Sequence, residues 1–458
     1  MKIVLVNPPT KSAPRNVLDA PLGLSYIAAI LINAGFGVTA LDLAISDSPW
    51  DDLTYILSNI QPDVIGITGV ASTHLDALSI ASIAKQINEN VITILGGVHV
   101  SLTKEKTSHI LANIDYMVFG EGEITIVELL YAIKNGGNIQ KVNGIGYSDE
   151  DGNFQKTEER LLISDLDTLP LPSRHLFPMG KYQQTHIMSS RGCSFSCLFC
   201  SSRDFWKQKT RFRSVTPFVD EIAHILDKYG PRKIFIADDT FTIDIKRAIE
   251  ICDTIIERKI NFNWSCLTRV DKVSDKLFEK MAKAGCQTIS FGCEVATQTE
   301  LDILKKGITV SQIKNAIVDC KKAGISARTS WIVGFPWLTD ESLSALLRLL
   351  DETTPDEVVI YTPVPYPGSR LYEYIGRYGV NLNEIPESDF YSGRDFPIPT
   401  SNALKPNEVN LSIEKVVIDL LEKGYKLSHQ AGPNDKIITT TFTAIHSFAV
   451  DDINRGES

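Results

Sequence analysis

Three cysteines, Cys193, Cys197 and Cys200, stand close together in the segment RGCSFSCLFC near the middle of the chain. Three thiolates on one short loop can hold three irons of a cubic [4Fe–4S] cluster and leave the fourth iron open to bind a small molecule. A structural zinc site usually needs four ligands in two pairs, and no second pair exists in the sequence. A disulfide would leave one cysteine over. The spacing therefore predicts an iron–sulfur cluster that takes part in chemistry.

The spacing C-x3-C-x2-C resembles the signature of the radical S-adenosylmethionine (SAM) enzymes. The resemblance implies that the open iron binds the amino and carboxylate groups of SAM, and that Phe199 lies near the adenine. It also implies that the reduced cluster splits SAM into methionine and a 5′-deoxyadenosyl radical. Such a radical takes a hydrogen atom from an unactivated carbon of the substrate.

Length and charge limit the classes of protein to which the chain can belong. Its 458 residues suffice for two or three domains of roughly 150 residues each. A net charge of −10 argues against a general nucleic-acid-binding protein, which needs basic groups to neutralise phosphates. The eight cysteines form no secreted disulfide pattern, and reduced thiols fit a cytoplasmic protein. No apolar run approaches the roughly 18 residues of a membrane helix, so we expect no membrane partner.

Short apolar strands alternate with amphipathic helices in residues 1–140. The strands are expected at 2–6, 38–43, 63–68, 91–97 and 115–120, and the helices near 23–34, 52–59, 74–88, 104–112 and 123–134. This alternation predicts a parallel sheet with helices on both faces, and such sheets bind ligands at the carboxyl ends of their strands. The candidate binding residues at those ends are Asn7, Pro8, Ser72, Thr73, Gly96, Gly97, Gly120 and Glu121.

The segments NPP, PLGLSYIAAIL, GGVH and GEGE follow one another in this region. Their order resembles the cobalamin-binding domain in front of many radical SAM proteins. The resemblance implies a Rossmann-like, flavodoxin-like fold in which the candidate residues contact cobalamin. The sequence lacks the Asp-x-His of related domains, so cobalamin would bind without a protein histidine on cobalt; His74 and His99 are expected to be helix-start or loop residues. A flavodoxin-like domain with no cofactor remains the alternative.

Residues 141–182 read as a connector with a small hairpin at GYSDEDGNFQKTEER and a proline-rich stretch after it.

Residues 183–375 again alternate between strands and helices. The strands are expected at 185–190, 233–238, 262–267, 287–292, 326–334 and 357–362. This pattern predicts an open (β/α)6 barrel, a partial TIM barrel whose catalytic groups gather at the carboxyl ends of the strands. Residues 376–458 are expected to form a small helical region, with an amphipathic helix at 409–427.

Polar residues fall at successive strand ends of the expected barrel. By the resemblance, Asp238 and Asp239 stand where the family contacts the SAM amino group, and an acid suits an ammonium. Arg269 matches an arginine that meets the SAM carboxylate, which a planar guanidinium can bind at two points. Glu294 matches a ribose or methionine contact, and Gly334 a backbone contact to adenine. A surface ion pair is the alternative role of each charged residue.

Taken over residues 1–375, the chain resembles the cobalamin-dependent radical SAM enzymes, in particular the group of the anaerobic Mg-protoporphyrin ester cyclase and the hopanoid methylases. The resemblance implies methylation of an unactivated carbon, or of phosphorus, in a small-molecule or peptide substrate. It also implies an electron donor such as flavodoxin or ferredoxin. A radical ring closure or rearrangement without methyl transfer stays open. A cobalamin-free enzyme of the methylthiotransferase kind is disfavoured because no cysteine precedes Cys193, and a non-enzymatic cobalamin sensor has no use for the cluster.

Overall fold

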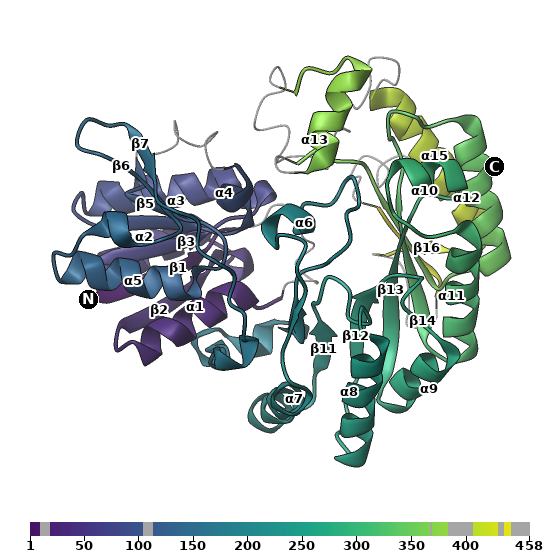
Figure 1. Ribbon diagram of the computed structural model, residues 1–458, viewed down its shortest axis with the longest axis horizontal. Coiled ribbons are helices and arrows are strands. Elements are labelled where there is room, and N and C mark those ends of the chain that lie inside the picture. The colour runs from purple at the N-terminus through teal and green to yellow at the C-terminus, as the bar shows by residue number, and fades with distance from the viewer. Residues whose placement is uncertain (10–18, 104–112, 367–368, 383–405, 429–434, 441–458) are drawn as a thin grey trace, which may run out of the picture.

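The computed structural model describes residues 1–9, 19–103, 113–366, 369–382, 406–428 and 435–440. Two α/β units lie side by side in it, an N-terminal unit and a larger barrel-like unit (Figure 1). The helix expected at 104–112 and most of the last thirty residues lie outside the described residues. Among the described residues, no helix is both long enough and apolar enough to cross a membrane.

The N-terminal sheet has seven strands in the order β2-β1-β3-β4-β5-β6-β7. Five of them are parallel: β1 (Lys2–Asn7), β2 (Gly37–Asp42), β3 (Val64–Thr68), β4 (Ile92–Gly96) and β5 (Tyr116–Val118). The strand order 2-1-3-4-5 is that of the flavodoxin-like doubly wound sheets, which confirms the predicted fold class. The expected hairpin forms from β6 (Ile145–Ser148) and β7 (Phe154–Lys156), and it extends this sheet in the antiparallel sense.

Helices cover both faces of this sheet because its central strands are apolar on both sides. They are α1 (Leu22–Asn33), α2 (Pro49–Ile60), α3 (His74–Ile87), α4 (Val98–Thr103) and α5 (Gly122–Lys134). Successive residues of a strand point to opposite faces. Ile3 and Leu5 of β1 therefore pack in one core with α1 and α5, whereas Val4 and Val6 pack in a second core with α2 and α3.

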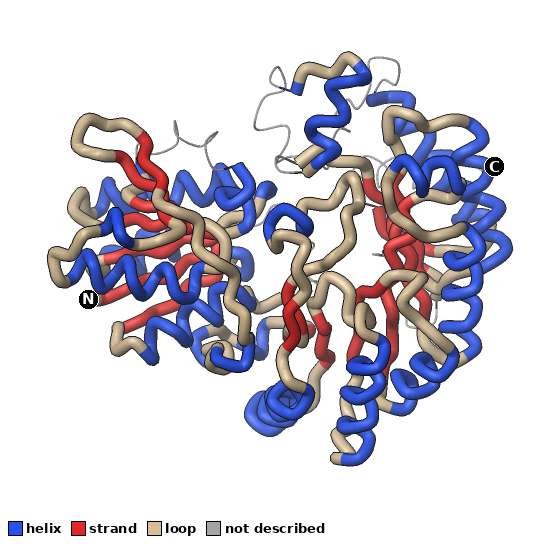
Figure 2. Tube along the Cα trace, viewed as in Figure 1, coloured by secondary structure: helices blue, strands red, loops and turns tan. Residues whose placement is uncertain are grey.

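The barrel unit has six parallel strands in chain order, as an open (β/α)6 barrel requires. They are β8 (Gln184–Ile187), β11 (Lys233–Ile236), β12 (Trp264–Thr268), β13 (Cys286–Glu294), β14 (Ser326–Ile332) and β15 (Glu357–Tyr361). The outer face of this sheet is covered by α7 (Val215–Tyr229), α8 (Ile245–Glu257), α9 (Asp275–Lys283), α11 (Val310–Lys322) and α12 (Asp340–Thr353), as Figure 2 shows. The shorter α10 (Gln298–Ile303) and α13 (Arg370–Ile375) follow β13 and β15.

The C-terminal region contains the expected amphipathic helix as α15 (Pro406–Glu422). It also contributes two strands that the sequence did not lead us to expect, β16 (Lys426–Leu427) and β17 (Ile437–Thr440). β17 pairs with β15 in parallel and β16 pairs with β17, so the barrel sheet has eight strands in all. The side chains of Leu427 and Ile438 are buried in the barrel core, which explains why these short segments join it.

A two-stranded antiparallel ribbon links the two units. Its strands are β9 (Ser190–Arg191) and β10 (Arg211–Phe212). The segment 192–210 between them, here called the cysteine loop, carries the three clustered cysteines and the short helix α6 (Ser202–Phe205). The ribbon therefore closes this loop at its base.

Candidate functional site

The cysteine loop is fixed by its backbone. Gly192 has a left-handed φ of +90°, and an added Cβ would lie 2.1 Å from the carbonyl oxygen of Lys209, so only glycine fits at the start of the loop. Further along, Leu198 donates its backbone N–H to the carbonyl of Leu304 at 2.9 Å and accepts one from Leu371 at 2.9 Å. The loop is thus held by the end of α10 on one side and by α13 on the other.

The three cysteines suit a cluster better than a single ion. Burial raises the pKa of the Cys200 thiol to about 12 and also raises that of Cys193, and a negative charge on Cys197 raises both further. Three neighbouring thiolates therefore need a strong positive charge beside them, which iron supplies. Within the part of the chain that the structure describes, no three His, Cys, Asp or Glu side chains are arranged around one metal ion. A cubic cluster does not need this, since each cysteine binds a different iron.

The two aspartates after β11, Asp238 and Asp239, differ in their hydrogen-bond partners. Asp238 is fully buried, and its Oδ1 and Oδ2 accept hydrogen bonds from the backbone N–H groups and hydroxyls of Ser189 and Ser190 at 2.6–3.1 Å. Asp238 thereby holds the turn between β8 and β9. Among the described residues, Ser202 is the one side-chain donor to Asp239, from Oγ to Oδ1 at 2.8 Å. Burial, together with the charge of Asp238, raises the pKa of Asp239. The ammonium group of a ligand would stabilise the charged form of this carboxylate. Asp239 is therefore the better candidate of the two for the contact with the SAM amino group.

Arg269 lies against the cysteine loop. Its guanidinium stacks over the ring of Phe195 at 3.6 Å from the centroid, and Nη1 lies 3.8 Å from Cys197 Sγ. Nε donates to Asp271 Oδ1 at 2.8 Å, and Nη2 donates to the carbonyl of Lys306 at 2.7 Å. The structure thus places this cation at the sulfur of a predicted cluster ligand. Its contact with the SAM carboxylate stays a prediction.

Glu294 is held by a lysine that sequence reasoning missed. The ladder between β13 and β14 shifts register at Glu294, which has a left-handed φ of +70°. Its Oε1 lies 2.8 Å from Nζ of Lys306, and both side chains are buried. Burial alone lowers the pKa of Lys306, but the negative charges of Glu294 and Cys197 outweigh it and raise the pKa. Lys306 is therefore charged, and it lies 5.7 Å from the ring centroid of Phe199.

The two predicted adenine contacts lie in one neighbourhood. The ring of Phe199 is 6.5 Å from that of Phe335, which follows Gly334 at the end of β14 and stacks on Trp337 at 5.0 Å. Gly334 has a φ of +112°, and an added Cβ would lie 2.7 Å from Val409 of α15. A glycine is therefore needed here for the close approach of α15, whatever its contact with a ligand.

An apolar pocket of about 390 Å³ runs from the N-terminal sheet to the barrel. Four of the predicted residues at the strand ends line it: Gly96, Gly97, Gly120 and Glu121. On the barrel side it is lined by His186, Met188, Arg191, Phe205, Trp206 and Ala237. The cysteine loop and the end of β11 thus share one pocket with the N-terminal sheet.

The other predicted residues of the N-terminal unit are not part of the described lining. Asn7 donates its side-chain amide to Asp42 Oδ1 at 2.7 Å, and Pro8 is buried beside it. Thr73 accepts a hydrogen bond from the backbone N–H of Val70 at 3.2 Å, which shapes the turn that contains Ser72. Thr68 and Val70, which precede this turn, line the pocket in their place.

His74 and His99 form a buried pair outside this lining. Their ring centroids are 4.1 Å apart, His74 begins α3, and His99 lies in α4. Burial, reinforced by His74, lowers the pKa of His99 to about 3, so this ring is neutral. Both residues therefore act in the packing of α3 against α4.

The pocket fits a large, mostly apolar group with a few polar contacts. Its walls are mostly aliphatic, aromatic and glycine residues, and the polar lining consists of Thr68, His186 and a small charged set at Glu121, Glu123 and Arg191. Arg211 stacks on Trp206 of the lining at 5.3 Å, and its buried Nε and Nη2 have no hydrogen-bond partner among the groups that the structure describes. Arg211 itself is not among the described residues that line the pocket, and it supports the wall through Trp206.

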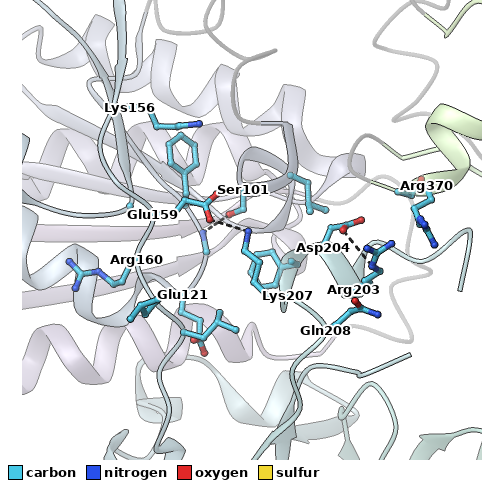
Figure 3. Close-up of a pocket in the computed structure, with 18 of the residues that line it drawn as sticks. Ser101, Glu121, Lys156, Glu159, Arg160, Arg203, Asp204, Lys207, Gln208 and Arg370 are labelled. Atoms are coloured by element: carbon cyan, nitrogen blue, oxygen red, sulfur yellow. Dashed lines mark hydrogen bonds and ion pairs between the residues drawn. The ribbon is translucent and has the colours of Figure 1, made fainter. Parts of the chain in front are cut away.

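A second, polar pocket of about 800 Å³ opens next to Glu121. It lies between the segment 156–162, α6 and α13, and Figure 3 shows its charged lining. Lys207 Nζ pairs with Glu159 Oε2 at 3.1 Å, and Arg203 lies 3.9 Å from Asp204. Arg370 of α13 stands on its far side. This pocket has the polarity that an entry route for a polar substrate requires.

Two family models match the chain in the same places as the two units. The model of the B12 binding domain matches residues 19–130, and that of the radical SAM superfamily matches residues 187–350. The chain is 37% identical over 382 residues to an uncharacterized methyltransferase of Pyrococcus horikoshii, which covers 82% of this chain and 83% of the relative. It is 30% identical over 393 residues to the anaerobic magnesium-protoporphyrin IX monomethyl ester cyclase of Rubrivivax gelatinosus, over 82% of this chain and 70% of the relative.

Among solved structures, the chain resembles the radical SAM methyltransferase TsrM of Kitasatospora setae, determined with cobalamin and a [4Fe–4S] cluster bound. The TM-score is 0.74 at 16% sequence identity, and the match covers 96% of this chain and 91% of TsrM. At this identity, the likeness shows a shared fold of both units.

Proposed function

Because the chain belongs to the radical SAM superfamily and carries a B12-binding domain, we propose that it is a cobalamin-dependent radical SAM methyltransferase. Its cofactors are a [4Fe–4S] cluster, SAM and cobalamin. The observation that carries the proposal is the apolar pocket, because Gly96 and Gly120 of the B12-binding domain share it with Trp206 of the cysteine loop. A methyl donor in this pocket would stand beside the site at which the substrate radical forms.

When bound, the cluster and SAM supply the hydrogen-abstracting radical, and cobalamin supplies the methyl group. In the proposal, Cys193, Cys197 and Cys200 hold the cluster, and Asp239 binds the SAM ammonium. Arg269 and Lys306 place two buried positive charges beside Cys197. The aromatic residues around Phe199 exclude water from the same space.

The substrate is proposed to be a polar small molecule or a peptide that enters through the polar pocket. Charged side chains of both signs surround this pocket, which favours a substrate with polar groups over a purely apolar one. The electron is proposed to come from a flavodoxin or a ferredoxin in the cytoplasm.

A second candidate function is a ring closure without methyl transfer, and the 30% identity to the ester cyclase of Rubrivivax gelatinosus favours it. The two functions differ in their SAM products. A methylation consumes two molecules of SAM and releases S-adenosylhomocysteine and 5′-deoxyadenosine in about equal amounts, whereas a ring closure releases no S-adenosylhomocysteine.

The test is to incubate the anaerobically reconstituted protein with SAM, a reductant and a metabolite extract, and to quantify both products. If added extract raises the amounts of S-adenosylhomocysteine and 5′-deoxyadenosine equally, methyl transfer is supported. If it raises the amount of 5′-deoxyadenosine alone, the ring closure is supported and the methyltransferase proposal is removed.

A further inference from the structure

We propose that Glu121 is a positioning residue that fastens both ends of the cysteine loop to the B12-binding domain. The sequence led us to expect Glu121 at cobalamin, as part of the segment GEGE. Its carboxylate binds two arginines of the ribbon at the base of the loop, and its contact with cobalamin stays a prediction. The inference extends the proposed function, but its first test is independent of it.

The ribbon brings the two ends of the loop together. Arg191 precedes the loop and Arg211 follows it, and the two residues stand opposite each other in the antiparallel pair of β9 and β10. Arg191 Nη1 donates to Glu121 Oε1 at 2.7 Å, and Arg211 Nη1 donates to Glu121 Oε2 at 2.7 Å. One carboxylate thus binds both arginines. It also cancels the repulsion that two like charges would feel when they lie directly opposite on a ribbon.

Further bonds fix the carboxylate itself. The backbone N–H of Ile163 donates to Glu121 Oε2 at 2.7 Å, and the carbonyl of Ile163 accepts from Arg211 at 2.6 Å. Glu123, in the first turn of α5, accepts a second bond from Arg191 at 2.7 Å. The set is formed by two carboxylates and two guanidinium groups, so it is electrically balanced.

The burial of this set of side chains indicates that its role is to position the cysteine loop. Glu121, Glu123 and Arg191 are 7%, 5% and 6% exposed. A complete buried set of ion pairs adds little stability over well-packed apolar side chains, whereas the loss of one member leaves an unpaired buried charge. Its geometric effect is specific, because each guanidinium donor meets its own oxygen. We therefore assign to it the placement of the loop.

Three members of the set also form part of the wall of the apolar pocket. Glu121, Glu123 and Arg191 line the pocket, and so do Tyr26 and Trp206, on which Arg191 and Arg211 stack at 5.1 and 5.3 Å. A group bound in the pocket therefore touches the residues that hold the loop. Glu121 sets how the cysteines stand relative to that group.

The first experiment measures hydrogen–deuterium exchange in the ligand-free full chain. Glu121→Gln keeps the size of the side chain but removes the charge between the arginines. Exchange in residues 190–212 should become about tenfold faster, as the loss of a charged hydrogen bond implies, while α5 keeps its exchange rate. Glu123→Gln should have a smaller effect, because Glu123 bonds to Arg191 at one end of the loop, whereas Glu121 bonds to both arginines. Glu128→Gln is the matched control, since Glu128 lies on the same helix and pairs with Arg160 at the surface. It should change neither segment.

The second experiment uses the reconstituted enzyme with a metabolite extract. Glu121→Gln should retain iron and still cleave SAM, but the methyl transferred per 5′-deoxyadenosine should fall about 10- to 100-fold, as expected for a misplacement of reacting groups. Unchanged exchange in residues 190–212, or an equal rise in α5, would overturn the inference, because Glu121 would then be dispensable or merely part of the core. If the wild type itself transfers no methyl group, the proposed function fails. The exchange measurement alone then decides whether Glu121 positions the cysteine loop.

Discussion

Lys306 Nζ lies 2.8 Å from Glu294 Oε1, in a buried ion pair between the segment after α10 and the end of β13. The pair joins two parts of the predicted SAM site, because Lys306 also stands 5.7 Å from the ring of Phe199. The pKa of Lys306 is raised above its ordinary 10.5. The stabilising contribution of this lysine is therefore fully present below pH 10.5 and is lost only as the pH rises through the raised value.

Lys306→Met should destabilise the protein by about 3–5 kcal/mol at neutral pH, because it leaves Glu294 buried without a counter-charge. Urea unfolding of the ligand-free protein at neutral pH measures this. The double variant Lys306→Met, Glu294→Gln should recover most of the stability at neutral pH. A loss in the double variant as large as that in the single one would contradict the ion pair as its cause.

Asp239→Asn should weaken SAM binding by about 1.5–3 kcal/mol without changing the iron content, since it removes a charged partner of the ammonium. The raised pKa of Asp239 adds a pH dependence: its charged form, and hence SAM binding, should be lost as the pH falls, at a higher pH than the ordinary value of 3.8 implies. Isothermal titration with SAM over a range of pH checks both points.

Asp238→Asn is the matched variant for this experiment. It should lower the iron content and the thermal stability, because Asp238 holds the turn at Ser189 and Ser190. Equal effects of the two variants on SAM affinity at full iron content would refute the different roles of the two aspartates.

Gly96→Leu should block cobalamin binding while the fold is kept. An added Cβ at Gly96 meets nothing closer than Val118 at 3.8 Å, and Gly96 lines the pocket, so we expect a larger side chain here to take up pocket space. Gly97→Ala should instead destabilise the chain by about 1–3 kcal/mol, because Gly97 has a φ of +108° and its Cβ would lie 2.4 Å from the carbonyl oxygen of Gly69. Cobalamin content after gel filtration and thermal melting separate the two effects. Full cobalamin content in Gly96→Leu would place the cofactor elsewhere.

Cys193→Ala, Cys197→Ala and Cys200→Ala should each abolish the visible absorbance of the cluster and the cleavage of SAM, because three thiolates hold three of the four irons. Cys320→Ala is the control, since Cys320 is buried on α11 and its thiol donates to the carbonyl of Ile325. It should keep its iron. Iron analysis after anaerobic reconstitution checks this. A complete cluster in any of the three cysteine variants would show that the changed cysteine is not a cluster ligand.

Local sequence patterns predicted the strands and their carboxyl ends well. Strand ends are set by apolar runs and the polar residues after them, so Asp239 and Glu294 were found at the mouth of the barrel. Lys306 was missed because it follows Lys305 in a charged segment that looks like a solvent-exposed face. The folded chain, in which the segment after α10 lies against the end of β13, brings it to Glu294.

The role of Glu121 could not be predicted for a related reason. Its partners Arg191 and Arg211 lie 70 and 90 residues away along the chain, and no local period marks such a contact. The strands β16 and β17 were missed because each is too short to show an alternation of apolar and polar residues. Their place depends on the open edge of β15, which is a property of the assembled sheet.

The most direct measurement of the proposed function follows a labelled methyl group. The reconstituted protein is incubated with SAM that carries deuterium on its methyl group, a reductant and a metabolite extract, and the extract is searched by mass spectrometry for a product that has gained this group. We predict such a product with the wild type, and none with the triple variant of Cys193, Cys197 and Cys200 to Ala. A wild type that yields no labelled product, or a triple variant that yields as much as the wild type, would contradict a radical SAM methyltransferase.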